Sequence, residues 1–187
     1  GDVAGVIGET TWEVAAALGY EKDQRKAGES RALQITPHTQ NGRTEFPLSF
    51  AQERLWFLDQ MEQGQSATYN IDTAVRLQGA LHVEALRRSL EEIMRRHSSL
   101  RTSFKLVEGQ PVQVIAPPQP FAIELVDLSE LTLTQREEVS LKLATEEAQT
   151  PFDLSRGPLL RATLLRLQED EHILLVTMHH IVSDGWS

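Results

Sequence analysis

The last ten residues constrain the fold of this chain more than any other stretch. An apolar run at 173–178 leads directly into His179 and His180, and Asp184-Gly185 follows at a fixed offset, which gives the pattern HHxxxDG. Apolar residues that run straight into titratable ones indicate a buried strand whose end places a reactive side chain at a cavity. A strand that is apolar at nearly every position fits a central place in a sheet, covered on both faces.

The rest of the chain alternates between helical and extended patterns. Apolar spacing and turn signals predict helices at about 49–62, 83–97 and 132–149, and strands at about 69–78, 101–107, 112–116, 121–128, 159–167 and 172–178. Capping-box patterns mark two helix starts, Ser49 with Gln52 and Thr132 with Gln135. This order predicts an α/β sandwich, with helices packed on one face of a mostly antiparallel sheet.

Residues 1–46 are expected to form a separate N-terminal part. Apolar residues within 1–20 recur at a spacing near 3.6 and predict a short amphipathic helix, and the polar stretch 21–46 is typical of a linker. A docking or linker role and a plain overhang are both open for this part. Because the chain begins with Gly1, we expect an excised or processed fragment whose folded lobe is 47–187.

Charge and composition narrow the classes of function. Eighteen basic residues against 27 acidic ones give a net charge of −9, which disfavours nucleic acid and anionic membranes as partners because phosphate binding requires a basic face. The absence of cysteine excludes disulfides, thiolate nucleophiles and Cys-ligated metals. No apolar run approaches the roughly 18–20 residues of a membrane span and no signal peptide is visible, so the expected location is the cytoplasm.

His180 is the candidate catalytic residue of the motif. A neutral imidazole accepts a proton near neutral pH, as acyl transfer to an amine or hydroxyl requires. Asp184 could turn back toward the ring or pair with an arginine, and Gly185 permits a sharp bend or a close approach to substrate. A strand end closed by two hydrogen-bonded histidines and a solvent turn would give the same letters without function. The Asp-Gly pair at this offset favours the functional interpretation.

A metal site is disfavoured by the alternation of side chains along a strand. His179, His180 and Asp184 are all possible ligands, but adjacent strand residues point to opposite faces, so the two histidines should not bind one ion together. His180 and Asp184 alone make a poor site, because zinc sites use three or four protein ligands. We therefore expect no metal.

Three stretches, taken in order, carry a recognisable set of motifs. Residues 49–58 read SFAQERLWFL, residues 96–104 read RHSSLRTSF and residues 178–187 read MHHIVSDGWS. They resemble the motifs SxAQxRLWxL, RHExLRTxF and MHHxxSDGWS of the condensation domains of non-ribosomal peptide synthetases, with Ser98 where that family usually has Glu. The stretches Tyr69-Asn70-Ile71 and GPLLR at 157–161 also resemble sequences of that family, so the resemblance covers about residues 46–187.

The resemblance implies a chloramphenicol-acetyltransferase-like fold of two similar lobes with the active site in a tunnel between them. It implies amide bond formation between thioesters that reach the tunnel on the 4'-phosphopantetheine arms of donor and acceptor peptidyl carrier domains. The chain itself would then bind no cofactor. Its partners would be those carrier domains, the C-terminal lobe of the same domain and the adjacent synthetase modules.

The resemblance also implies roles for individual residues. His180 falls on the family's main catalytic residue, and Asp184 falls on a structural position whose expected partner is Arg96. The other positions carried over as scaffold beside the site are His179, Gly185, Gln52, Arg54 and Arg101. The stretch LWFLDQ at 55–60 resembles the subtype that joins an L-configured donor to an L-aminoacyl acceptor. Because the chain stops just after HHxxxDG, we expect the isolated fragment to be inactive.

Two other functions are open at this point. The same superfamily includes ester-forming and coenzyme-A-dependent acyltransferases, which would use the same His180. A fragment whose residues 1–46 dock an upstream carrier or subunit would instead be an interaction module without catalysis.

Overall fold

The computed structural model describes residues 44–183. The predicted N-terminal helix, Asp184 and Gly185 therefore lie outside the described residues. Within 44–183, no helix has both the length and the apolar content that crossing a membrane requires.

The strands form two sheets instead of one. The larger sheet has the order β2-β7-β6-β5, made of β2 (Asn70–Gln78), β7 (Glu171–His179), β6 (Leu160–Gln168) and β5 (Glu124–Asp127). The smaller has the order β1-β4-β3, made of β1 (Glu45–Pro47), β4 (Gln110–Ile115) and β3 (Thr102–Val107). All neighbouring strands are antiparallel except β5 and β6. The predicted mostly antiparallel α/β fold is confirmed, and β7 occupies the central place that its apolar sequence predicts.

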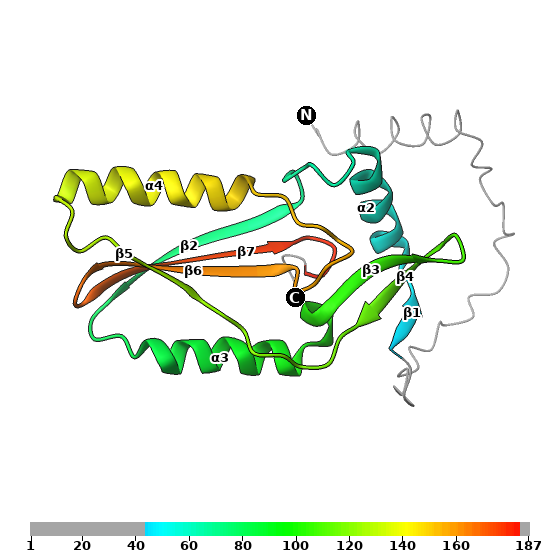
Figure 1. The fold of residues 1–187 in the computed structure, drawn as a ribbon, viewed down its shortest axis with the longest axis horizontal. Coiled ribbons are helices and arrows are strands. Elements are labelled where there is room, and N and C mark those ends of the chain that lie inside the picture. The colour runs from blue at the N-terminus through cyan, green and yellow to red at the C-terminus, as the bar shows by residue number, and fades with distance from the viewer. Residues whose placement is uncertain (1–43, 184–187) are drawn as a thin grey trace, which may run out of the picture. The chain divides into compact units, whose positions relative to one another are not determined.

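The helices cover both faces of the larger sheet. Figure 1 shows α3 (Val83–Arg96) on one side and α4 (Leu133–Gln149) on the other. On β6, Ala162 belongs to a buried cluster with Met94 of α3. Leu165, of opposite parity on the same strand, belongs to a second cluster that includes Leu143 of α4. The expectation that the helices lie on one face is wrong in this respect, because both faces of β6 and β7 are apolar and each needs a cover.

Both predicted capping boxes are present. Ser49 begins α2 (Phe50–Met61): its hydroxyl accepts from the Gln52 N–H at 3.3 Å, and its own N–H donates to Gln52 Oε1 at 2.9 Å. Thr132 and Gln135 form the same pair at the start of α4, at 3.4 and 3.0 Å. These contacts satisfy N–H groups that a helix start otherwise leaves unpaired.

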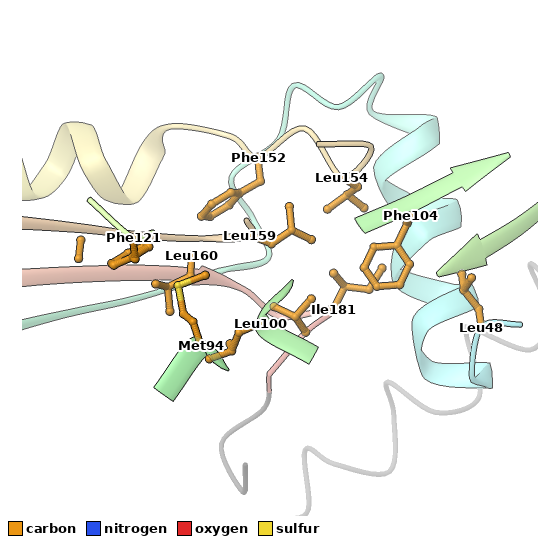
Figure 2. Packing of buried hydrophobic residues seen from close by; sticks show 12 residues of the cluster. Leu48, Met94, Leu100, Phe104, Phe121, Phe152, Leu154, Leu159, Leu160 and Ile181 are labelled. Carbon is orange, nitrogen blue, oxygen red and sulfur yellow. The ribbon is translucent and has the colours of Figure 1, made fainter. Parts of the chain in front are cut away.

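The larger buried cluster joins the two sheets. Figure 2 shows side chains that run from Leu48 and Phe104 through Ile181 to Leu160 and Phe121. The N–H of Phe104 also donates to the carbonyl of Leu154 at 2.8 Å, which ties β3 to the loop after α4. This core holds the end of β7, where the histidine pair lies.

Strand β5 is shorter than predicted. It begins at Glu124 and not near 121, because Phe121 is buried in the core with only 6% of its surface exposed. The Phe121 N–H donates to the side chain of Glu91 on α3 at 3.1 Å, so it makes no ladder bond. A short 3-10 helix, η1 (Ser98–Arg101), connects α3 to β3.

Candidate active site

His180 directly follows the last residue of β7, and its side chain is exposed. The backbone N–H of His180 donates to the backbone carbonyl of Tyr69 at 2.8 Å, which extends the pairing of β7 with β2 by one residue beyond the strand end. Its ring Nδ1 lies 2.7 Å from the carbonyl oxygen of Ser183. Because a carbonyl only accepts, this contact places a proton on Nδ1, and in the neutral ring Nε2 then holds the free lone pair. Nε2 is therefore the ring atom that can accept a proton from a bound substrate.

His179 faces the interior, with 2% of its surface exposed. Its Nδ1 accepts the N–H of Ile181 at 3.1 Å, and its ring lies 6.3 Å from the ring centroids of both Tyr69 and Phe152. Burial, with a smaller effect from the neighbouring His180, lowers the pKa of His179 to about 4. His179 is consequently neutral at pH 7. The buried ring of His179 and the exposed ring of His180 agree with the alternation of side chains along a strand.

Arg101 fastens the C-terminal end of α3. Its guanidinium donates to the carbonyls of Met94 at 2.9 Å and Arg95 at 3.5 Å, and also to the carbonyl of Ala116. A cation at these carbonyls complements the negative end of the helix dipole. Arg101 thereby connects α3 to the segment that follows β4.

Arg96 lies in the last turn of α3 with its side chain 67% exposed. Its Nε is 2.6 Å from Glu92 Oε1, and Glu92 also binds Arg95. Hydrogen bonds from Arg95 and then from Arg96 lower the pKa of Glu92 to about 2. Because Asp184 lies outside the described residues, the pairing of Arg96 with Asp184 stays a prediction.

The remaining scaffold candidates lie on α2. The side chain of Arg54 is exposed and makes no hydrogen bond or ion pair with another residue of the described range 44–183. Gln52 closes the capping box with its oxygen, and its Nε2 lies 3.5 Å from Gln113 Oε1 on β4. The structure thus brings His179 and His180 together at one strand end, while Arg101 and Gln52 hold neighbouring elements in place.

Four residues near His179 carry no role predicted from the sequence. Tyr69 and Phe152 lie against its ring, Asn70 pairs with it in the sheet, and Arg161 lies over the Phe152 ring. Three of them lie in the stretches Tyr69-Asn70-Ile71 and GPLLR, which the sequence singles out without explaining. No motif or pattern in the sequence points to Phe152. No group of three or more His, Asp or Glu side chains suited to a metal ion occurs in the part of the chain that the structure describes.

Comparison with known proteins identifies the family. The family model described as "Condensation domain" matches residues 42–187. A linear gramicidin synthase polypeptide from Brevibacillus parabrevis is 48% identical over 156 residues, which are 83% of this chain and 2% of the relative. Malpibaldin synthetase from Mortierella alpina is 52% identical over 141 residues, which are 75% of this chain and 2% of the relative. The chain therefore spans only a small part of the relatives it matches.

Solved structures agree on the fold. The starter condensation domain of rhizomide synthetase RzmA matches with a TM-score of 0.70 at 24% identity, covering 77% of this chain and 36% of that one. The first condensation domain of the calcium-dependent antibiotic synthetase matches with a TM-score of 0.68 at 26% identity, covering 76% and 34%. With a histidine pair at the end of β7, three motifs in order and these matches, the chain belongs to the condensation-domain family of non-ribosomal peptide synthetases.

Proposed function

We propose that this chain is the N-terminal lobe of a domain that forms peptide bonds between two carrier-bound substrates. The donor is an acyl or peptidyl thioester, the acceptor is an aminoacyl thioester with a free α-amine, and both are carried on 4'-phosphopantetheine. The observation that carries the proposal is the geometry of His180. Its Nδ1–H is held by the Ser183 carbonyl, and its Nε2 lone pair is left for a substrate proton on an exposed ring.

In the proposed reaction, the acceptor nitrogen attacks the carbonyl carbon of the donor thioester. The new C–N bond forms as the C–S bond breaks, and the donor's phosphopantetheine leaves as a thiolate. His180 Nε2 takes the proton that the attacking amine loses and passes it to the departing sulfur, so the histidine returns to its starting form. No redox change occurs and no cofactor of the chain is needed.

Positioning contributes more to this reaction than proton transfer. An α-amine has a pKa near 8, so roughly a tenth of it is already neutral at pH 7. General base catalysis contributes about 10²–10⁴-fold, whereas holding two reactants in register lowers a barrier by roughly 7–11 kcal/mol. His180 is therefore proposed to orient the amine and stabilise its developing charge as well as to accept its proton.

The other candidate site residues are proposed to be scaffold. Their support is positional: Arg101 fixes α3, Arg96 ends the same helix, and Arg54 and Gln52 lie in the first motif. Asp184 and Gly185 complete the motif in sequence. Residues 1–46 are proposed to be a linker or docking segment, and 47–187 the lobe. The proposed partners are the two carrier domains, the second lobe and neighbouring modules, and not nucleic acid or membrane.

The test is His180→Ala in the parent synthetase, with both carrier domains loaded. We expect the single-turnover rate of peptide bond formation to fall by about 10²–10⁴-fold, because the proton acceptor is lost. The matched control is His82→Asn, which changes a histidine at the far end of α3 to a residue that also caps helices. An unchanged rate in His180→Ala would contradict the proposal, as would turnover of acyl-coenzyme A without any carrier domain.

A further inference from the structure

Two stretches that the proposed chemistry does not use meet around His179. Asn70 of β2 is the direct partner of His179 in the sheet, and Arg161 of β6 is the direct partner of Thr177 on β7. Strand alternation places Asn70, Arg161 and His179 on the same face of the sheet, the one covered by α4. The side chains of Asn70 and Arg161 reach the C-terminal end of that helix.

Arg161 supplies the cation at the end of α4, because the last turn of that helix has no basic residue of its own. Its Nε lies 2.6 Å from Glu147 Oε1, and its Nη2 donates to the carbonyls of Glu147 at 3.1 Å and Thr150 at 2.8 Å. Its Nη1 donates to the carbonyl of Pro151 at 3.4 Å. One guanidinium thus satisfies carbonyls that a helix end leaves unpaired and places a positive charge where the helix dipole favours it.

Asn70 holds the same segment from the other side. Its Nδ2 donates to the carbonyls of Ala148 at 2.8 Å and Thr150 at 2.9 Å. The Thr150 carbonyl therefore accepts from Asn70 and Arg161 together. These bonds hold the chain just before Phe152, whose ring lies against His179.

Phe152 connects the contacts of Arg161 and Asn70 to His179. The Arg161 guanidinium carbon lies 3.8 Å from the Phe152 ring centroid, and the Phe152 ring meets His179 edge to face, at 84°. Phe152 is 5% exposed and Tyr69 lies against the same imidazole, so both rings exclude water from it. Figure 2 shows Phe152 within the core, beside Leu159.

His179 in turn shapes the loop that contains His180. Its Nδ1 accepts the Ile181 N–H, and its carbonyl accepts the Val182 N–H at 3.1 Å. These two bonds fold the chain so that Ser183 meets the ring of His180. A protonated His179 has no lone pair on Nδ1 and cannot accept from Ile181. The loop geometry therefore depends on His179 staying neutral and enclosed.

We propose that Arg161, together with Asn70, is a positioning residue of the proposed active site: it holds residues 150–152 so that Phe152 encloses His179 and the loop presents His180 correctly. This inference rests on the proposed function for its kinetic consequence, while its structural part stands on the contacts alone. The titratable and charged groups nearest to the His179 ring are Asp72 and Arg161, which both pair with Thr177 on its face of the sheet, Glu147 of α4, and Tyr69, Asp153 and His180 in the adjoining segments.

The kinetic test compares Arg161→Met with wild type in the parent synthetase. We expect kcat for peptide bond formation to fall by about 10–100-fold, because small misplacements of a catalytic group have effects of this size. KM for the carrier-bound acceptor should stay within about twofold, because no substrate contact is removed. The matched control is Arg166→Met on the same strand, which removes a partly exposed arginine whose Nη1 lies 3.5 Å from Asp127. Arg161→Lys should restore part of the rate, because lysine keeps the charge but not the planar fork.

A second readout separates positioning from a general structural role. Opening the enclosure raises the His179 pKa from about 4 toward the ordinary value of 6.5. The loss of rate that follows protonation of His179 should therefore occur at higher pH in Arg161→Met and in Phe152→Leu. Nuclear magnetic resonance titration of labelled histidines in the parent protein should show the same rise for His179, and no rise in Arg166→Met.

Each outcome decides the inference. An unchanged kcat, or a lower kcat with an unshifted profile and an unshifted His179 pKa, overturns it. If Arg161→Met does not fold, Arg161→Lys and Phe152→Leu carry the same comparison. If wild type forms no peptide bond, the proposed function fails, and the His179 titration alone still decides whether Arg161 encloses the ring.

Discussion

His179 and His180 differ by one position and have opposite environments. The side chain of His179 is buried between two aromatic rings, and that of His180 is exposed beyond the strand end. This contrast follows from strand alternation and could be predicted from the sequence. The enclosure of His179 could not, because Phe152 and Arg161 are distant in sequence and only the fold brings them to β7.

The buried His179 should make stability depend on pH. Its folded pKa of about 4 lies below the unfolded value of 6.5, so the unfolded state binds more protons between these values. The free energy of unfolding should therefore fall as pH drops from about 6.5 to 4, by about 3 kcal/mol for this group. Urea denaturation at several pH values measures this effect.

The variant His179→Gln isolates this contribution, because carboxylates also titrate near pH 4. Glu92, whose pKa is lowered from 4.5 to about 2, adds a loss of stability as pH falls from about 4.5 to 2, and this loss is the same in wild type and His179→Gln. The difference between wild type and His179→Gln should shrink as pH falls through the window. A difference that stays constant from pH 7 to pH 4 would contradict a neutral, buried His179.

Among the elements, helices were easier to predict than strands. Helix starts are encoded within four residues, and Ser49 and Thr132 fulfil their capping boxes. Strand pairing is not encoded locally: nothing near 102–107 or 110–115 says that this hairpin joins β1 in a second sheet. The start of β5 also depends on a residue distant in sequence, because the backbone N–H of Phe121 donates to the side chain of Glu91 on α3.

The junction between α3 and β4 should depend on Arg101. Arg101→Met leaves three carbonyls without their donor, and we expect a loss of about 1–3 kcal/mol in the free energy of unfolding. Arg54→Met is the matched control, because the Arg54 side chain is exposed and has no partner among residues 44–183. Chemical denaturation of both variants checks the contrast. Equal stability of the two would show that the Arg101 contacts contribute nothing.

At the scale of the whole molecule, the family and the fold class were predictable because three motifs occur in order over most of the chain. The cover on both faces was predictable from the apolar sequence of β7 alone, but the expected arrangement of the whole sandwich placed the helices on one face. Both faces are filled by helices of this chain, α3 and α4. His180, by contrast, faces outward from the described lobe.

The isolated chain should not form peptide bonds. It covers about a third of the solved condensation domains it matches, at 36% and 34%. In the proposed function, a second lobe holds the two substrates against His180, so this lobe alone should lose the positioning contribution of roughly 7–11 kcal/mol. Mass spectrometry of carrier-bound products should show dipeptide with the parent synthetase only. Product from the isolated chain above its His180→Ala background would contradict this expectation.

The pairing of β2 with β7 has a consequence for the order of events during synthesis. Asn70 pairs with His179, so the first strand of the larger sheet receives its neighbour only after about a hundred further residues are made. At 5–20 residues per second, β2 waits roughly 5–20 seconds on the ribosome without its ladder. The strand that completes the sheet is the one that ends in the histidine pair. Closure of this sheet and formation of the candidate site are therefore a single late step of folding, governed by a long-range contact.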